Sequence, residues 1–328
     1  MNRSSRLSQR ASAMASAFAT AFATATVTRT ALATACLLAL ASLLSGCASR
    51  PLPPAPPRAA AEADRLSTQA AKLQREENWA GAADWWQRAG RQYQLLNRPA
   101  DVALAQHNEG SCRRALGQPD AALRLLGEAS STNLRLGRTN AWWRNQIALL
   151  QLENAQSPGQ ALEHLRQLDP RLPSLESQPA LLGLLHHESA RAQIGAGHPP
   201  SSALESANRA QALFHLAQDP AGEAAVRLTR ARILQMQGDL PAAVAEWRLA
   251  LAAFEQLGQP RAIATSLAGL GTALTQGNSS NAEGLEILRR ARDNFAVLKM
   301  ETDAKAIQET LDRLETGVRP SNPPGSAR

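Results

Sequence analysis

The chain has few of the residues that enzyme and metal sites usually require. Its 328 residues include three cysteines, six histidines and one tyrosine, and aromatic residues make up 4% of the total. No second pair of ligands stands at metal-binding spacing, and no phosphate loop or nucleophile elbow occurs. His186, His187 and Glu188 are adjacent, but neighbouring side chains on a helix point about 100° apart and do not share a metal. We therefore expect no catalytic residue, no metal site, no cofactor and no enzyme activity.

The chain also lacks the excess of basic charge that attracts nucleic acid. Its formal net charge is +7, and the first 46 residues supply +4 of it through four arginines and no acids, which leaves +3 for the rest. No cluster of basic residues is interleaved with aromatic residues, so we expect no nucleic-acid partner. No stretch alternates polar and apolar residues with period two, and we expect no β-sheet.

What the sequence has instead is a repeat of about 40 residues. Phe214, Phe254 and Phe295 each precede a break in a helical pattern, and they are 40 and 41 residues apart. Tyr93 and Leu134 hold the equivalent place upstream, 41 residues apart. A two-helix unit with this period predicts a helical solenoid, because a single helix of this length does not bury its apolar stripe alone.

Pro and Gly mark the expected helix boundaries. We predict paired helices at 59–76 and 79–96, 99–116 and 119–136, 139–155 and 158–168, 180–196 and 201–216, 220–237 and 240–257, and 260–276 and 281–298. Residues 169–179 form a loop, and a closing helix at 301–316 has the charged outer face of a solenoid cap. The repeat domain thus covers 59–316, and we expect residues 317–328 to be a disordered tail.

The repeat resembles the tetratricopeptide repeat superfamily. The family pattern of Gly-Asp followed by large and small residues at spacings of three and four is matched by Gly238, Asp239, Leu240, Ala243, Trp247 and Ala250. Further matches are Asn78, Trp79, Ala82, Trp86 and Ala89, then Gly117, Ala122, Leu126 and Ala129, with Leu270-Gly271 and Gly110 in the first helices. The resemblance implies an all-α, right-handed superhelical solenoid of about six helix-turn-helix repeats plus the capping helix. It also implies an interaction scaffold.

In that family the first helix of each repeat lines a concave groove. Counting from Gly110 and its equivalents, the resemblance places partner-binding residues at Leu104, His107, Ser111, Arg114, Trp143, Gln146, Leu150, Arg232 and Gln235. The register of the third unit is taken from Leu149 in this count. The same count adds Glu153, Ala225, Leu228, Thr265, Ala268, Thr272 and Thr275.

For three further side chains, the question is whether they are buried in the repeat domain or exposed at its surface. Trp142 and Trp143 are adjacent, so both do not face one narrow apolar stripe, and Trp143 is either covered by a neighbouring unit or exposed to a partner. For Trp85, beside Trp86, we expect coverage. Cys112 has no cysteine partner inside the repeat domain, and we expect it to be a small buried residue.

The first 46 residues have the form of a signal peptide. A basic start, which begins at Met1 or Met14, leads into the apolar segment 31–44. That segment is shorter than the ~20 residues of a transmembrane helix. The junction Leu44-Ser45-Gly46-Cys47 resembles the bacterial lipoprotein box, which implies cleavage before Cys47 and lipidation of that cysteine.

The residues after Cys47 refine the expected location. Ala48 and Ser49 lack the Asp that retains such lipoproteins at the inner membrane, so the resemblance implies a lipid anchor in the outer membrane, on the periplasmic side. The Pro-rich segment 47–58 is expected to be an extended tether between the anchor and the repeat domain.

These expectations combine into an outer-membrane-anchored periplasmic adaptor that binds a protein or peptide partner in a cell-envelope assembly. By resemblance, such lipoproteins serve pilus secretin assembly, barrel insertion or control of peptidoglycan synthases. One alternative is a regulatory subunit of a peptidoglycan-active enzyme, and another is a small-ligand-binding lipoprotein. A deep closed pocket would favour the ligand-binding protein, and an open concave groove would favour the adaptor.

Overall fold

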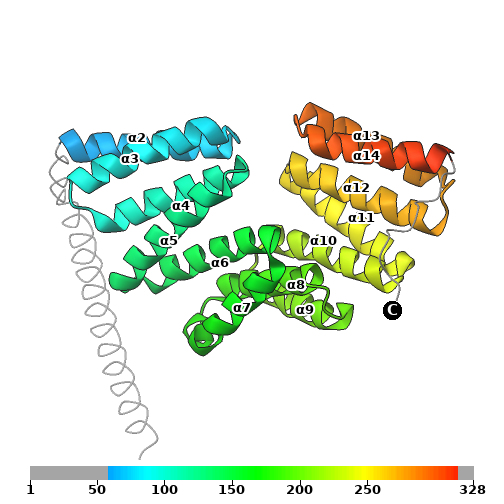
Figure 1. Ribbon diagram of the computed structural model, residues 1–328, viewed down its shortest axis with the longest axis horizontal. Helices are drawn as coiled ribbons and strands as arrows, with labels where there is room; N and C mark the ends of the chain where they lie inside the picture. The colour runs from blue at the N-terminus through cyan, green and yellow to red at the C-terminus, as the bar shows by residue number, and fades with distance from the viewer. Residues whose placement is uncertain (1–57, 317–328) are drawn as a thin grey trace, which may run out of the picture. The chain divides into compact units, whose positions relative to one another are not determined.

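The structure, a computed structural model, describes residues 58–316 (Figure 1). Within this range the chain forms α-helices and one 3₁₀ helix, and none of these residues belongs to a strand. The elements are α2 (Arg58–Arg75), α3 (Trp79–Leu95), α4 (Pro99–Ala115), α5 (Pro119–Arg135), α6 (Thr139–Gln156), α7 (Pro158–Leu168), η1 (Asp169–Leu175), α8 (Pro179–Gly195), α9 (Pro200–Leu216), α10 (Pro220–Gln237), α11 (Leu240–Leu257), α12 (Pro260–Gly277), α13 (Ala282–Val297) and α14 (Glu301–Thr316).

The helical solenoid predicted from the sequence is confirmed. Each helix packs against the next one along the chain, so the described residues form six helix pairs followed by the single helix α14 (Figure 1). The helix boundaries depart from the predicted ones by no more than one residue. One segment differs, because part of the predicted loop 169–179 is the 3₁₀ helix η1, which buries Leu175.

Several sequence predictions lie outside the described residues. They concern the signal peptide 1–46, the anchor Cys47, the tail 317–328 and all of the tether 47–58 except Arg58, with which α2 begins. None of the described helices combines the length and the apolar character that crossing a bilayer demands.

Two local signals set the turns between helices. A proline opens α4, α5, α7, α8, α9, α10 and α12, where its missing N–H and fixed φ do no harm. Asn78, Asp219, Asp239 and Asn281 cap the next helix, each accepting a hydrogen bond from the backbone N–H three residues on. Glycines in the left-handed region end five of the helices, with φ between 61° and 81°.

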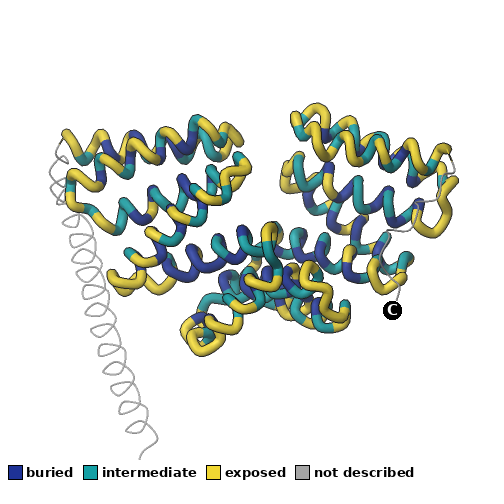
Figure 2. Tube along the Cα trace, in the orientation of Figure 1, coloured by how far each residue is buried: buried dark blue, intermediate teal, exposed yellow. Residues whose placement is uncertain are grey.

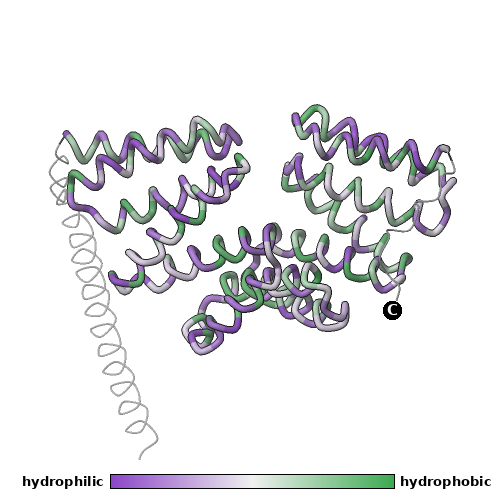
Figure 3. The backbone as a smooth tube through the Cα atoms, viewed as in Figure 1, coloured by the Kyte–Doolittle hydropathy of each residue, from purple (hydrophilic) through white to green (hydrophobic). Residues whose placement is uncertain are grey.

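The core consists of many alanines together with larger leucine, isoleucine, phenylalanine and tryptophan side chains. Phe214, Phe254 and Phe295, which marked the period in the sequence, are all buried, and Cys112 is buried as expected. Burial follows one side of each helix, and α6 is buried along most of its length (Figure 2). Hydrophobic and hydrophilic residues alternate along each helix accordingly (Figure 3). This is the pattern of amphipathic helices that each pack on two neighbours.

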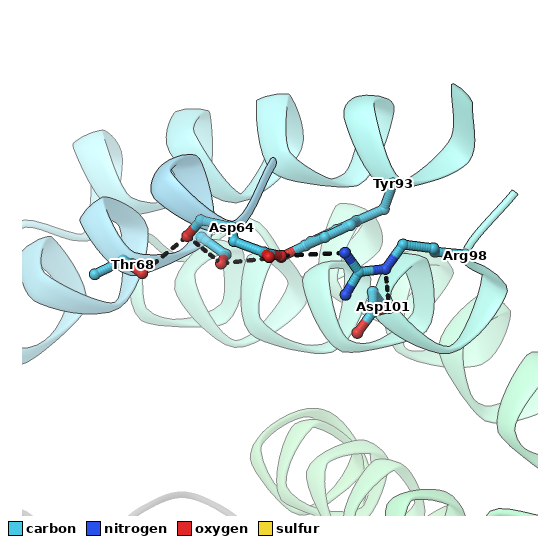
Figure 4. A network of polar contacts seen from close by, with 6 residues as sticks. Asp64, Thr68, Tyr93, Arg98 and Asp101 are labelled. Atoms are coloured by element: carbon cyan, nitrogen blue, oxygen red, sulfur yellow. Dashed lines mark hydrogen bonds and ion pairs between the residues drawn. The ribbon is translucent and has the colours of Figure 1, made fainter. Parts of the chain in front are cut away.

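A polar network joins the first three helices (Figure 4). The Tyr93 hydroxyl donates to Asp64 Oδ1 over 3.0 Å, and Arg98 Nη1 donates to the same oxygen over 3.2 Å. Arg98 Nε also donates to Asp101 Oδ2 at 2.7 Å. One carboxylate on α2 therefore binds α3 and the turn before α4, and the network fixes how the first pair meets the second.

One ion pair joins parts of the domain that are far apart in the sequence. Arg261 Nε, at the start of α12, lies 3.0 Å from Glu77 Oε2 in the turn between α2 and α3. Both side chains are partly exposed. The pair links the first and the sixth helix pair, whereas the packing contacts between helices join near neighbours in the chain.

Candidate functional site

The first helices of successive pairs present one face at matched positions. Helices α4, α6, α8, α10 and α12 follow one another at about 40-residue intervals, and each contacts the next. The positions that the family count gives around Gly110 in α4 can be transferred to the other first helices by their distance from the first residue of each helix. Matched by helix start, this stripe is Leu104, His107, Ser111 and Arg114 in α4; Arg144, Ile147, Gln151 and Asn154 in α6; Leu184, His187, Arg191 and Ile194 in α8; Ala225, Leu228, Arg232 and Gln235 in α10; and Thr265, Ala268, Thr272 and Thr275 in α12.

A cavity of about 420 Å³ lies against four of these first helices. The residues that line it are Asn154 from α6, His187, Arg191, Ile194 and Gly195 from α8, Ala225, Leu228, Thr229 and Arg232 from α10, Trp247 from α11, and Thr265 from α12. Most of them belong to the matched stripe. The stripe is therefore a concave surface where it passes from α6 to α12.

A second cavity of about 570 Å³ extends this surface toward the last helix. It shares Arg232, Trp247 and Thr265 with the first cavity and adds residues of α10, α12, α13 and α14, among them Gln235, Gln276, Phe295 and Asp303. Because three residues line both cavities, we treat them as one surface and call it the inner groove. Its lining mixes aliphatic and aromatic side chains with amides, hydroxyls and charged groups.

Trp247 packs at the junction of the two cavities. It is 4% exposed, and its ring lies so close to Gly269 on α12 that a Cβ there would stand 2.4 Å from ring carbons. A glycine at position 269 is what allows this approach. The Trp247 indole N–H and Asn154 Oδ1 are both buried, and neither has a hydrogen-bond partner among the described residues.

The residues predicted to bind a partner lie on the concave surface in α10 and α12 but not in α6. Arg232 and Gln235 line the inner groove, together with Ala225 and Leu228. In α12 the predicted Thr265, Ala268 and Thr272 do so as well. Thr275 is buried instead, and its hydroxyl donates to the carbonyl of Gly271.

In α6 the structure places Trp143, Gln146 and Leu150 in the interior. The count from Leu149 was one residue short, since the helix start places Leu150 at the position of Gly110. One residue turns a helix by about 100°, which moves the predicted stripe from the groove into the core. Trp143 and Leu150 are completely buried, so neither side chain reaches the groove surface.

The polar atoms of Gln146 are used inside the protein. Its Nε2 donates to Ser130 Oγ at 2.6 Å, and its Oε1 lies 2.7 Å from His164 Nε2. The other ring nitrogen of His164 lies 2.9 Å from Glu153 Oε2. These contacts join α5, α6 and α7. They include Glu153, which the count from Leu149 had also predicted for the groove.

The four residues predicted in α4 divide by exposure. Leu104 and Arg114 are exposed, whereas His107 and Ser111 are half-buried. Burial, together with the nearby charges of Arg144 and Arg114, lowers the pKa of His107 to about 4. His107 is therefore a neutral side chain at neutral pH, within electrostatic reach of two stripe arginines.

A buried carboxylate balances one arginine in the middle of the stripe. Glu188 accepts hydrogen bonds from Arg191 Nη1 at 2.9 and 3.1 Å and from Asn154 Nδ2 at 2.8 Å. His187 beside it contacts Thr229 Oγ1 through Nε2 at 2.8 Å. Burial is the main cause that lowers the pKa of His187 to about 4, so it too is neutral at neutral pH.

Sequence reasoning missed several groove residues, among them Asn154, His187, Arg191 and Trp247. The signal that would have found the first three is the constant spacing of helix starts, which needs no glycine marker. Trp247 belongs to the second helix of its pair and reaches the groove only because Gly269 leaves it room. Among the described residues there is no group of three or more side chains that could hold a metal ion.

Comparisons with known proteins give fold likeness alone. No protein-family model matches the chain, and no curated protein sequence matches it. Solved structures do match, among them the Rap protein complexed with competence and sporulation factor, with 12% identity, 77% of this chain and 74% of that chain covered, and a TM-score of 0.56. The apo form of RapI matches with 10% identity, 78% and 98% coverage and a TM-score of 0.53. BtubC (BKLC) from P. vanneervenii matches with 16% identity, 83% and 96% coverage and a TM-score of 0.50.

Proposed function

We propose that the protein is a lipid-anchored periplasmic adaptor whose inner groove holds a segment of a protein partner in a cell-envelope assembly. The observation that carries the proposal is the groove itself, a concave surface that crosses four first helices and mixes apolar with polar side chains. A surface of that length suits an extended segment, because each successive helix contributes its own contacts. The Rap protein, which shares the fold, is known in complex with competence and sporulation factor.

The anchor is supported by the sequence around Cys47. An apolar segment followed directly by Leu44-Ser45-Gly46-Cys47 resembles a lipoprotein signal, and the Pro-rich residues after it would hold the repeat domain away from the bilayer. Each buried CH₂ of an acyl chain contributes about 0.8 kcal/mol, and stable anchoring takes more than one chain. The groove would then face partners that reach the inner side of the outer membrane.

The anchor is tested by Cys47→Ser. We expect the variant to accumulate as a larger, unprocessed precursor and to be absent from outer-membrane fractions, because the serine cannot receive the lipid that permits cleavage. Immunoblots of fractionated cells measure both effects, with Cys112→Ser as the matched control that should leave processing unchanged. A Cys47→Ser chain that is still cleaved and still extracted with outer membranes would refute the anchor.

Binding in the groove is tested by photo-crosslinking in living cells. A benzophenone amino acid at Gln235 or Gln276, which line the groove, should capture an envelope protein that mass spectrometry identifies. The same label at Gln256, an exposed glutamine on the second helix α11, should not capture it. Equal capture from Gln256 and from the groove positions would place the contact elsewhere, and the adaptor proposal would then lose its site.

A further inference from the structure

The matched stripe carries one arginine on each of four successive first helices, and the two on α8 and α10 also line the inner groove. The four arginines are Arg114 on α4, Arg144 on α6, Arg191 on α8 and Arg232 on α10. Only Arg191 has a carboxylate within ion-pair distance, namely Glu188. Among the described residues, no ion pair or side-chain hydrogen bond involves Arg114, Arg144 or Arg232.

Arginines on other faces of the same helices are neutralised differently. On α10, Arg227 and Arg230 both pair with Glu246 of α11, at 3.1 and 3.2 Å. On α4, Arg113 pairs with Glu109 at 3.2 Å. The contrast within single helices shows that acids are available to the packed faces and are missing from the stripe.

None of the acids near the stripe pairs with Arg114, Arg144 or Arg232. Glu188 accepts hydrogen bonds from Arg191 and Asn154, and Glu153, which is not a stripe residue, contacts His164 on α7. Asp303 lines the groove only at its α14 end. Because His107 and His187 are neutral at neutral pH, the part of the stripe from α4 to α10 keeps the net positive charge of its three unpaired arginines.

Two of these arginines lie within electrostatic reach of one histidine, because the charges of Arg144 and Arg114 both lower the pKa of His107. Burial is the main cause that lowers the pKa of Arg114. The charges of Glu188 and Arg191 on α8 shift that pKa in opposite directions, so Arg114 lies within electrostatic reach of α8. Like charges gathered on a concave surface repel one another and focus a positive potential into it. A ligand with negative charge would relieve that repulsion.

We propose that the occupant is an acidic, extended segment of a protein partner that runs from the inner groove along the matched stripe onto α6 and α4, with carboxylates that bind Arg232, Arg144 and Arg114. This inference rests on the proposed function and adds the chemistry of the partner. Aliphatic stripe residues such as Ile194 and Leu228 line the same cavity as Arg232, so the segment carries apolar side chains as well as acidic ones. That mixture favours a polypeptide over a polyphosphate or a lipid surface.

The spacing of the helices sets the spacing of the acids. Packed helices lie about 8–10 Å apart, and a chain in the extended polyproline II conformation advances about 3.1 Å per residue with three residues per turn, so every third side chain points the same way. A segment that crosses the first helices therefore meets a new one at roughly every third residue. The matching sequence has an acid at each third position and small or aliphatic residues between.

The test uses full-length protein in mild detergent and a fluorescein-labelled dodecapeptide with Glu at every third position and Ala or Val between. Fluorescence anisotropy should show binding, and the same peptide with Gln or with Lys in place of Glu should bind at least about tenfold more weakly. Arg144→Gln and Arg232→Gln should each weaken the Glu peptide by roughly tenfold. Arg290→Gln, the same charge change at an exposed residue of α13, should change it less than about twofold.

Three outcomes would overturn the proposal. They are equal affinity for the Gln peptide, an Arg290→Gln effect as large as that of the stripe variants, and binding to phosphatidylglycerol vesicles that depends on the stripe arginines without binding of the Glu peptide. Thermal melts of the variants identify any that fail to fold, in which case Arg114→Gln replaces them. If Gln235 and Gln276 still crosslink a protein while the Glu peptide shows no preference, the adaptor stands and the acidic partner is wrong. If the crosslinks fail as well, both proposals fall.

Discussion

Replacing Trp143 with alanine should lower the free energy of unfolding by about 3–5 kcal/mol. The side chain is 0% exposed and meets Trp142 edge to face, with ring centroids 4.8 Å apart and planes at 68°. Its indole N–H donates to Ser174 Oγ at 2.9 Å and thereby holds η1 against α6. Alanine would leave a cavity in the core and would remove the hydrogen bond to Ser174 that holds η1 against α6. Chemical denaturation followed by circular dichroism measures the loss.

Trp85 supplies the matched control for that prediction. It is only partly buried, and the guanidinium groups of Arg65 and Arg88 lie 5.8 and 5.6 Å from its ring centroid. Trp85→Ala removes an exposed aromatic–cation contact, which is worth about 0.5–1 kcal/mol. If the two alanine variants lost the same stability, Trp143 would not be the core residue that its burial indicates.

Phe254→Ala should cost a similar ~3–5 kcal/mol, but its effect should be local. Phe254 is buried with Ala224 and Ala250, and residues of α10, α11 and α12 pack around this cluster. In a solenoid each unit contacts only its neighbours, so the loss should fall on the adjoining helices. Hydrogen exchange measured by mass spectrometry should show faster exchange in α10–α12 and unchanged protection in α2–α5.

The same measurement separates a repeat from a single cooperative core. Because each helix packs mainly on its neighbours in the chain, the loss of stability should stay local. Uniform loss of protection from α2 to α14 would contradict this expectation. Leu249→Ala provides the comparison, since Leu249 lies on the same helix with its side chain about half exposed and should leave exchange nearly unchanged.

The fold followed from the sequence because its signals are local. Prolines at helix starts, polar caps and glycines after helix ends fix each boundary without reference to the rest of the chain. The phased Phe214, Phe254 and Phe295 then fixed the register of the units in which they occur. Each large residue fills the gap between two helix pairs, so its period is the period of the packing.

The groove was only partly predictable, for a physical reason visible in α6. In α4 and α12, glycine marks the closest contact with the second helix, at Gly110 and Gly271. In α6 the same position is Leu150, which no small residue distinguishes from its neighbour Leu149. The following helix α7 is short and is completed by η1, and the core of this unit takes in Ile147, a stripe residue that is 4% exposed. Trp247 reaches the groove because its ring packs against Gly269 on the next helix. This contact depends on the tertiary structure, so neither residue predicts it from the sequence.

The pair Glu77–Arg261 has a consequence for how the chain folds and moves. Among the described residues it spans 184 positions, whereas every other side-chain hydrogen bond spans at most 42. Contacts this local give a low contact order and rapid folding, because little loop entropy is lost before each contact forms. The long-range pair forms after the helices on either side of it. As an exposed ion pair it contributes about 0–1 kcal/mol, so the first and sixth helix pairs can separate and rejoin while every helix between them stays folded.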